Sequence, residues 1–391
     1  MKKIEDFILP SIREMPPSGI RKYFDMINEM QDVISLGVGE PDFVTPWNIC
    51  EAGIFSLEKG QTSYSSNAGF IELRRAISDY LNRRFEMKYD AENEILVTVG
   101  GSEAIDIALR AIVGKGDEVI IPEPSFVAYT GCTLMTGATP VPIPLQEKNS
   151  FKLTVEELEA AFTPNTKLII LGFPNNPTGA IMTREELAPI ANFLKDKDVI
   201  VISDEIYAEL TYSGKHASIT SFPEMRDKTI MVSGFSKAFA MTGWRIGYVC
   251  ANPILTDAMK KIHQYALMCS PTISQKAAIE AMNNGQLEVE KMTREYNRRR
   301  RLMIDGFRKA GLTCFEPLGA FYVFANVSGT GLTSEEFCDR LLIEHKVLMI
   351  PGEAFGESGR GFARATYATS YENIIEACKR IKNFTDSLRR G

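Results

Sequence analysis

Residues 229–247 read Thr-Ile-Met-Val-Ser-Gly-Phe-Ser-Lys-Ala-Phe-Ala-Met-Thr-Gly-Trp-Arg-Ile-Gly. The stretch opens with a short apolar run, as expected of a strand that is buried between two layers of helices. Ser236 and Lys237 follow this run, and Arg245 comes shortly afterwards among glycines. A lysine just past a strand is ordinarily a surface lysine, so the meaning of Lys237 depends on which residues the fold brings to it.

Apolar runs of the same kind alternate with longer amphipathic stretches from about residue 64 to residue 251. The runs predict strands at Ile95–Val99, Glu118–Pro122, Lys167–Gly172, Val199–Ser203, Thr229–Ser233 and Ile246–Cys250. Helical periodicity lies between them, for example at Ser102–Val113 and Thr183–Lys195. This alternation predicts an α/β fold with a mostly parallel central sheet.

The pattern changes after Pro253, and a chain of 391 residues exceeds the usual size of one domain. Helical periodicity dominates residues 275–310, and the remainder predicts a smaller α+β unit. Its expected elements are strands at Ala320–Ala325, Val347–Ile350 and Phe362–Ala368 and helices at Ser334–Glu344 and Glu372–Arg389. We therefore expect a large α/β domain at residues 46–285 and a small domain built from residues 1–45 and 286–391.

The composition argues against several classes of protein. A net charge of -6 disfavours a broad nucleic-acid or membrane-lipid surface, and the basic run Arg298–Arg301 follows several glutamates, which predicts a solvated helix face. The seven cysteines include no CxxC pair, so we expect neither a disulfide framework nor a metal site. No stretch reaches the roughly 20 apolar residues of a membrane helix, and the N-terminus lacks a signal-peptide core. We expect a cytoplasmic protein.

In open parallel sheets, ligands bind beyond the carboxyl ends of the strands, and two of these ends suit a phosphate. Gly100 and Gly101 permit a tight turn, and the N–H groups that open the next helix, as far as Ser102 and Glu103, can bind an anion. A Gly-Gly turn on its own is more often only a turn. Arg245, among glycines that allow close approach, suits a phosphate dianion.

Three other strand ends carry side chains that suit an aromatic cofactor. Phe126 can cover the face of a flat ring, and Asn176 can donate to a ring oxygen. Asp204 can pair with a cationic ring nitrogen, and Tyr207 reaches the same ligand. Each group has an ordinary alternative: a packed aromatic loop, an asparagine turn and a helix N-cap. Together with Lys237, however, they are the parts that a pyridoxal phosphate site requires.

The sequence as a whole resembles the class I and II aminotransferases, and in particular their bacterial and archaeal aspartate and aromatic branch. The motifs that carry the resemblance are Gly39–Phe43, Tyr64 with Gly69 and Leu73-Arg74, Asn176–Gly179, Asp204–Tyr207, Ser236-Lys237, Gly243–Gly247, Gly319–Tyr322 and Arg364. The resemblance implies the type I fold of pyridoxal-phosphate-dependent transferases. It also implies a homodimer with shared active sites.

The resemblance assigns roles around the cofactor ring. Lys237 would form a Schiff base with pyridoxal phosphate and later move the substrate proton. Asp204 would keep the ring nitrogen protonated, so that the ring can accept electrons. Asn176 and Tyr207 would hydrogen-bond the ring oxygen, and Phe126 would stack on the ring.

The resemblance also assigns the phosphate and substrate contacts. The phosphate would be held by Gly101, Ser102, Glu103, Ser236 and Arg245, with Tyr64 from the partner subunit. Arg364 would grip the substrate α-carboxylate through a bidentate pair, beside the Gly39 N–H and near Asn176. The implied small-molecule partners are an amino acid and a 2-oxo acid.

Two positions depart from the family pattern. Tyr129 stands where some members have a histidine near the ring-nitrogen acid. Aspartate-selective members supply an extra cation, either an arginine in the region read here as Gln264–Gln275 or a lysine at the place of Ser102, and this chain has neither. The side-chain pocket is instead expected to accept aromatic or apolar groups, with an acidic donor such as glutamate also binding. Its expected members are Ile20, Tyr64, Phe126 and Tyr265.

The leading hypothesis is a transaminase that works by ping-pong exchange between an L-amino acid and a 2-oxo acid. Two alternatives stay open at this point. One is a β-lyase or related elimination enzyme with the same lysine and acid, and the other is a non-catalytic regulatory protein with an aminotransferase-like body. The three histidines, His216, His263 and His345, lie beside none of the motifs in the sequence, so Lys237 is expected to do the proton work.

Overall fold

The structure, a computed structural model, describes residues 3–15, 19–20, 22–23, 26 and 30–389. The strands are β1 (Ile34–Ser35), β2 (Ile95–Thr98), β3 (Glu118–Glu123), β4 (Thr139–Pro144), β5 (Thr166–Gly172), β6 (Ile200–Asp204), β7 (Thr229–Gly234), β8 (Gly247–Cys250), β9 (Thr313–Cys314), β10 (Tyr322–Asn326), β11 (Val347–Leu348), β12 (Ile350–Pro351) and β13 (Phe362–Thr366). The α-helices are α1 (Pro10–Arg13), α3 (Trp47–Glu58), α4 (Ile71–Phe85), α5 (Gly100–Ile112), α6 (Ala128–Thr136), α7 (Val155–Ala161), α8 (Arg184–Leu194), α9 (Pro223–Arg226), α10 (Pro253–Ala266), α11 (Thr272–Asn284), α12 (Gln286–Lys309), α13 (Ser334–His345) and α14 (Tyr371–Leu388).

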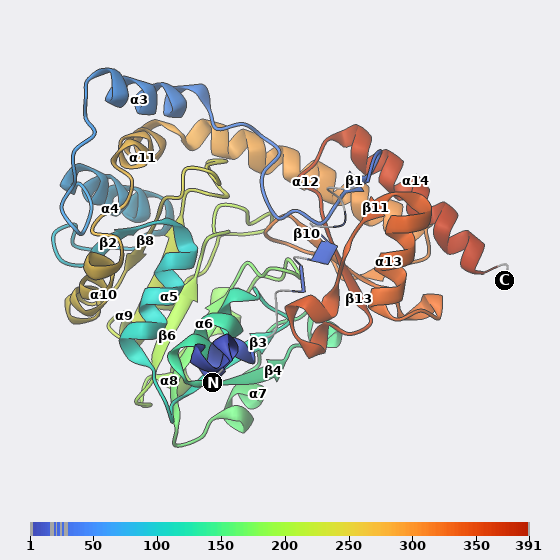
Figure 1. The fold of residues 1–391 in the computed structure, drawn as a ribbon, viewed down its shortest axis with the longest axis horizontal. Coiled ribbons are helices and arrows are strands. Elements are labelled where there is room, and N and C mark those ends of the chain that lie inside the picture. The colour runs from blue at the N-terminus through green and yellow to red at the C-terminus, as the bar shows by residue number, and fades with distance from the viewer. Residues whose placement is uncertain (1–2, 16–18, 21, 24–25, 27–29, 390–391) are drawn as a thin grey trace.

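The largest sheet in the described part of the chain has seven strands, in the order β2-β8-β7-β6-β5-β3-β4 (Figure 1). The strands from β7 to β4 pair in parallel. Only β8 runs the other way, between β2 and β7. The predicted mostly parallel α/β sheet is therefore confirmed.

The central strands are buried on both faces because successive side chains enter different helix layers. In β2, Leu96 packs in one apolar cluster with Ile105 of α5. Its neighbours Ile95 and Val97 pack in another cluster with residues of α4 and α11, among them Leu73. The two layers hold the sheet so that the carboxyl ends of its parallel strands face one cleft.

One strand of this sheet was not predicted. Strand β4 has the sequence Thr-Pro-Val-Pro-Ile-Pro, with proline at every second position. It pairs only with β3 and forms the edge of the sheet. Proline cannot donate to a strand ladder and is confined to edges, while the residues between the prolines keep their N–H groups for pairing. The same alternation looks like loop sequence when it is read without the sheet.

A second sheet, β12-β13-β10-β9, is antiparallel and packs with α12 and α13, and α14 packs on these two helices. The prediction of one strand at Val347–Ile350 was wrong. Two short strands occur there, because the chain changes sheets at Met349. The first, β11, pairs in parallel with β1, and the second, β12, pairs with β13. This pairing joins the N-terminal segment to the C-terminal sheet.

The basic run on α12 was also interpreted wrongly as a solvated helix face. Arg298 and Arg301 are exposed, but Arg299 and Arg300 are 7% and 4% exposed. Each buried guanidinium has an acidic partner outside α12, which is Asp42 for Arg299 and Glu316 for Arg300. Sequence neighbours on a helix point about 100° apart, so a run of four arginines cannot share one environment.

Two further properties of the described ranges bear on function. No helix there is both long enough and apolar enough to cross a membrane. The same ranges bring together no group of three or more histidine, cysteine or acidic side chains in an arrangement suited to a metal ion.

Candidate active site

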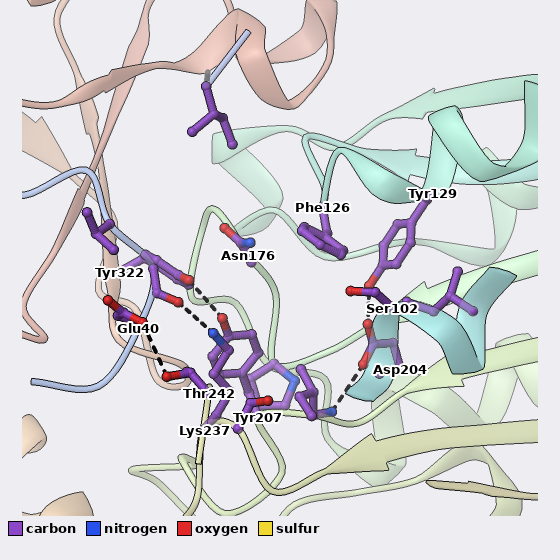
Figure 2. A pocket seen from close by; sticks show the side chains of 18 of the residues that line it. Glu40, Ser102, Phe126, Tyr129, Asn176, Asp204, Tyr207, Lys237, Thr242 and Tyr322 are labelled. Atoms are coloured by element: carbon purple, nitrogen blue, oxygen red, sulfur yellow. Dashed lines mark hydrogen bonds between the residues drawn. The ribbon is translucent and has the colours of Figure 1, made fainter. Parts of the chain in front are cut away.

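The loops that follow five strands of the large sheet meet at one pocket, which residues 38–40 and two residues of the C-terminal sheet close from the other side. Figure 2 shows Phe126 and Tyr129 across this pocket from Tyr322 and Glu40. The predicted site residues that line it are Gly39, Gly101, Ser102, Phe126, Asn176, Asp204, Tyr207, Ser236, Lys237, Arg245 and Arg364. Gly39 and Arg364, which are 325 positions apart, are thus assembled around one space.

Lys237 lies just past β7, and its Nζ donates to the main-chain oxygen of Gly39 at 2.5 Å. Burial lowers the pKa of Lys237 to about 8, and the positive charges of Arg364 and Arg245 act in the same direction, whereas nearby acids oppose them. A lysine with this pKa has an appreciable neutral fraction near neutral pH. Its amine can therefore act as a nucleophile and as a base.

Asp204 ends strand β6 and is buried. Its Oδ2 accepts a hydrogen bond from the Tyr129 hydroxyl at 2.7 Å, and its Oδ1 accepts from the Ile206 N–H at 3.1 Å. Burial raises the pKa of Asp204, although both hydrogen bonds favour the charged form. A cation placed against this carboxylate would hold it ionised, and a protonated ring nitrogen is such a cation.

Tyr207 and Tyr322 face each other in the pocket, with their hydroxyl oxygens 2.7 Å apart. Burial raises the pKa of both phenols, so both hydroxyl groups are neutral at physiological pH. Tyr322 was not predicted as a site residue. Tyr322 belongs to the motif Gly319–Tyr322, which the sequence did show. The sequence does not show that its position in the antiparallel sheet places its side chain next to Tyr207, just past the end of β6.

The first turn of α5 and Arg245 form one end of the pocket. Gly101 and Ser102 of that turn line the pocket together with Ser236. The Arg245 guanidinium lies against Gly100, where an added Cβ would be 2.6 Å from Nη2, and Gly100 has φ +80°. Free N–H groups at a helix start and a guanidinium together suit a phosphate.

Arg364 comes from β13 and is buried. Its Nη2 donates to the main-chain oxygen of Gly37 at 2.6 Å, and its Nη1 donates to Oδ1 of Asn176 at 2.8 Å. The guanidinium carbon lies 4.6 Å from the ring centres of both Tyr322 and Phe355. Its Nε is buried and has no hydrogen-bond partner among the described residues. A buried, unused donor on a guanidinium suits a carboxylate ligand.

Asn176 and Phe126 lie where a flat ring could be held between the two sides. Because Oδ1 of Asn176 accepts from Arg364, its Nδ2 group is left as the donor for a ligand oxygen. Phe126 lines the pocket and meets Tyr129 edge to face, with ring centres 5.7 Å apart.

Three predicted residues do not line the pocket. Tyr64 and Tyr265 are 79% and 91% exposed, so only Ile20 and Phe126 of the expected side-chain pocket lie there. The third is Glu103, whose carboxylate accepts from the Val99 N–H. The contribution of Tyr64 to a partner subunit's site stays a prediction.

No histidine is adjacent to a motif in the sequence, but the fold brings two of the three into contact with motif residues. Nδ1 of His263 lies 2.6 Å from Oε1 of Glu103, and Nε2 of His216 lies 2.7 Å from Oε2 of Glu205. The first contact spans 160 positions of the sequence and the second spans 11. Neither histidine lines the pocket, so Lys237 remains its candidate base.

The pocket thus offers an anion-binding end at the start of α5 (the cup), an aromatic side chain, an acid, an amine and a free guanidinium donor. Pyridoxal phosphate fits this set, because its phosphate, ring nitrogen and aldehyde match the cup, the acid and the amine. The guanidinium then suits the carboxylate of an amino acid. Together, the fold and the site define an enzyme that uses this cofactor on amino acids.

Comparison with known proteins agrees with that class. The family model for class I and II aminotransferases matches residues 31–381. YugH of Bacillus subtilis is 52% identical over 373 residues, which are 95% of this chain and 97% of the relative. The aspartate aminotransferase of Pyrococcus abyssi is 44% identical over 369 residues, 94% of this chain and 95% of the relative. The aromatic aminotransferase of Pyrococcus horikoshii has 41% sequence identity with this chain. Its crystal structure matches with a TM-score of 0.90 and covers 94% of this chain and 99% of that one.

The chain belongs to the class I and II aminotransferases and is a pyridoxal-phosphate-dependent transaminase. The resemblance inferred from the sequence is therefore confirmed. None of the comparisons favours the β-lyase or the regulatory alternative.

Proposed function

We propose that Lys237, Asp204 and Tyr207 are the catalytic residues of this transaminase, and that Arg364 binds the substrate. The observation that carries the proposal is the position of the Lys237 amine. It lies in one pocket with a buried acid, a phenol and a buried guanidinium that has an unused donor. Among the described residues, no other lysine lines this pocket.

Bound pyridoxal phosphate supplies a ring that accepts negative charge from the substrate Cα. Lys237 removes the proton from Cα and returns it, because its pKa lies near the working pH. Asp204 holds the proton on the ring nitrogen, and Asn176 and Tyr207 hydrogen-bond the ring oxygen. Arg364 would hold the α-carboxylate and so fix the orientation of the Cα–H bond relative to the Lys237 amine.

The remaining contacts bind the cofactor and the substrate carboxylate. The cofactor-phosphate ligands are the N–H groups of Gly101, Ser102 and Glu103, the hydroxyl of Ser236, the guanidinium of Arg245 and the partner subunit's Tyr64. Phe126 covers the ring face, and the Gly39 N–H assists Arg364 at the carboxylate, with Asn176 beside it.

The substrate class follows from the charges that line the pocket. The cations among its lining residues are Lys237, Arg245 and Arg364. In the proposed mechanism Lys237 is the reacting amine, Arg245 binds the cofactor phosphate and Arg364 binds the substrate α-carboxylate. Within the described lining, no cation remains for a second carboxylate. Ile20 and Phe126 instead offer apolar contact, so we propose aromatic or apolar L-amino acids as preferred donors and the matching 2-oxo acids as products. Glutamate is the proposed acidic donor.

We also propose a homodimer with shared sites. Several large apolar or aromatic side chains are exposed on the single chain, including Val44 (87%), Trp47 (69%), Tyr64 (79%) and Tyr265 (91%). Such side chains at an interface would be removed from water. The proposal extends to a cytoplasmic location and to the division into residues 46–285 and residues 1–45 with 286–391.

A panel of amino donors tests the function and the substrate class together. Each L-amino acid should shift the absorbance of the bound cofactor, and 2-oxoglutarate should shift it back. We expect phenylalanine or tyrosine to react at lower concentration than aspartate. The absence of any reversible cycle would reject the function, whereas a preference for aspartate would reject only the substrate class. An active monomer by solution mass would reject the dimer.

A further inference from the structure

Residues 37–45, here called the cleft strap, cross the pocket between the two sheets. No strap residue belongs to a helix or strand. The strap nevertheless contacts both basic groups that the proposed reaction uses. Its Gly39 oxygen accepts from Lys237 at 2.5 Å, and its Gly37 oxygen accepts from Arg364 at 2.6 Å.

The strap is packed closely at this point. A Cβ added to Gly39 would lie 2.3 Å from the Tyr322 hydroxyl oxygen. The Glu40 carboxylate accepts from the Thr242 hydroxyl at 3.2 Å, which ties the strap to the loop that follows Lys237. A small displacement of the strap would therefore move the groups that face Lys237 and Arg364.

Side chains hold the strap at its far end. Nη1 of Arg299 lies 2.8 Å from both carboxylate oxygens of Asp42. Its guanidinium carbon also lies 5.0 Å from the ring centre of Phe43. The Arg299 side chain is 9% exposed, and its Nε donates to Glu295 of the same helix at 3.0 Å. Removal of Arg299 would leave the partly exposed Asp42 carboxylate without this partner, and removal of Asp42 would leave the buried Arg299 guanidinium with Glu295 alone.

A second anchor fixes the strap to the large sheet. The Thr45 hydroxyl donates to the main-chain oxygen of Ala240 at 2.6 Å and accepts from the Trp244 indole at 3.0 Å. Between Thr45 and the pocket, the ion pair of Arg299 with Asp42 holds the strap in place. It originates on α12, a helix that supplies no residue of the pocket lining.

We propose that Arg299 is a positioning residue of the transaminase. It holds the cleft strap so that the Gly37 oxygen orients Arg364 and the Gly39 N–H meets the substrate α-carboxylate. This inference rests on the proposed role of Arg364. Arg299 itself touches neither substrate nor cofactor.

Arg300 provides a matched control on the same helix. It is also buried, at 4% exposure, and its Nη1 donates to Glu316 at 2.8 Å and to the main-chain oxygen of Pro317 at 3.0 Å. None of these contacts involves the strap. Loss of Arg300 should therefore weaken the fold, mainly because the buried carbonyl of Pro317 loses its donor, without displacing Gly37 or Gly39.

The experiment compares Arg299→Gln, Asp42→Asn, the double variant and Arg300→Gln in the full-length, cofactor-loaded protein. Half-reactions with L-phenylalanine, L-glutamate and L-aspartate give a rate at saturation and a half-saturating concentration for each variant. Hydrogen exchange of the peptide that covers residues 36–43 reports the strap directly, and thermal melting reports stability.

We expect Arg299→Gln and Asp42→Asn each to raise the half-saturating concentration roughly 10- to 100-fold, with a smaller loss in rate at saturation. Hydrogen exchange of the strap should become faster in both variants. The double variant should raise the half-saturating concentration no more than either single variant, because the two residues form one contact. Arg300→Gln should keep the half-saturating concentration and the hydrogen exchange of the strap at their wild-type values. This should hold even if it lowers the melting temperature as much as Arg299→Gln does.

Equal half-saturation in Arg299→Gln and wild type, or equal changes in Arg299→Gln and Arg300→Gln, would overturn the proposal. If Arg299→Gln does not fold, Asp42→Asn decides, because the Asp42 side chain is 28% exposed and its loss is less disruptive. If the wild-type protein reacts with none of the three amino acids, the proposed function fails, and strap exchange alone still decides the inference.

Discussion

The two walls of the active-site pocket are built in different ways. The cofactor wall, named for the group that we propose it binds, consists of residues at or just past the ends of strands of the large sheet, among them Asn176, Asp204 and Lys237. The substrate wall consists of the cleft strap and Arg364, which come from opposite ends of the chain. Arg364 and Gly37 are hydrogen-bonded although 327 positions separate them.

The difference shows how firmly each wall is held. Strand ladders and two helix layers fix the ends of β5, β6 and β7, so the cofactor wall moves only if the sheet does. The strap has no strand-to-strand hydrogen bonds and is held by a few side-chain contacts. We therefore expect substitutions in the substrate wall to change substrate binding and to leave cofactor binding largely intact.

The largest effect is expected from Lys237→Ala in the cofactor wall. Turnover should fall more than about 10,000-fold because the base and the nucleophile are the same amine. The phosphate contacts should still retain the cofactor, which spectroscopy of the purified variant measures. Lys261→Ala, which removes a lysine that is 70% exposed on α10, should keep full turnover. Retained turnover in Lys237→Ala would refute the assignment of this residue.

Arg364→Leu tests the substrate wall. The loss of a bidentate carboxylate contact should raise the half-saturating donor concentration about 100-fold or more. Cofactor affinity, measured by titration of the cofactor-free protein, should change little. The control is Arg360→Leu, because the Arg360 side chain is 73% exposed and pairs only with Glu357 among the described residues. Equal losses of cofactor and substrate affinity would show that the walls are not independent.

The pH dependence of Lys237 should be visible in the cofactor-free protein. Its pKa is about 8 in the folded chain and 10.5 in its ordinary state. Between these values only the unfolded chain holds the proton, so the free energy of unfolding should rise with pH from 8 to 10.5, by up to about 3 kcal/mol. Denaturant titrations at several pH values measure this rise, and Lys237→Ala should lack it. Recombination with pyridoxal phosphate should accelerate with a midpoint near pH 8, and a midpoint near 10.5 would contradict the burial of the amine.

The smallest effect is expected at Tyr322, which lies between the walls. Tyr322→Phe removes the hydroxyl that pairs with Tyr207, a contact worth about 1 kcal/mol or several-fold in rate. Tyr296→Phe is the matched control, because the buried Tyr296 hydroxyl has no partner in the described structure. If Tyr322→Phe alters the half-saturating donor concentration alone, Tyr322 belongs to the substrate wall. A change confined to the rate at saturation would place it with the cofactor wall.

Most of the cofactor wall was predictable because each of its residues is adjacent in sequence to the strand that positions it. The apolar runs predict the strands, and parallel strands place their carboxyl ends at one edge. The strand β4 escaped prediction because its prolines are tolerated only at a sheet edge, and edge position is not visible in the sequence. The burial of Arg299 and Arg300 was not predicted for a similar reason, since their acidic partners, Asp42 and Glu316, lie outside α12 and the helical pattern does not show which acids the fold brings to it.

The sequence alone determined the chemistry of this protein: a lysine, an acid, an amide, a glycine-rich helix start and two arginines at the right spacings. The tertiary structure decided how those groups act on one another. Burial lowers the pKa of Lys237 and raises that of Asp204, and packing brings Tyr322, His263 and Arg299 to partners that the sequence does not place beside them. The physical reason is that desolvation and hydrogen bonding depend on distance in space, which local sequence patterns specify only within one strand, turn or helix.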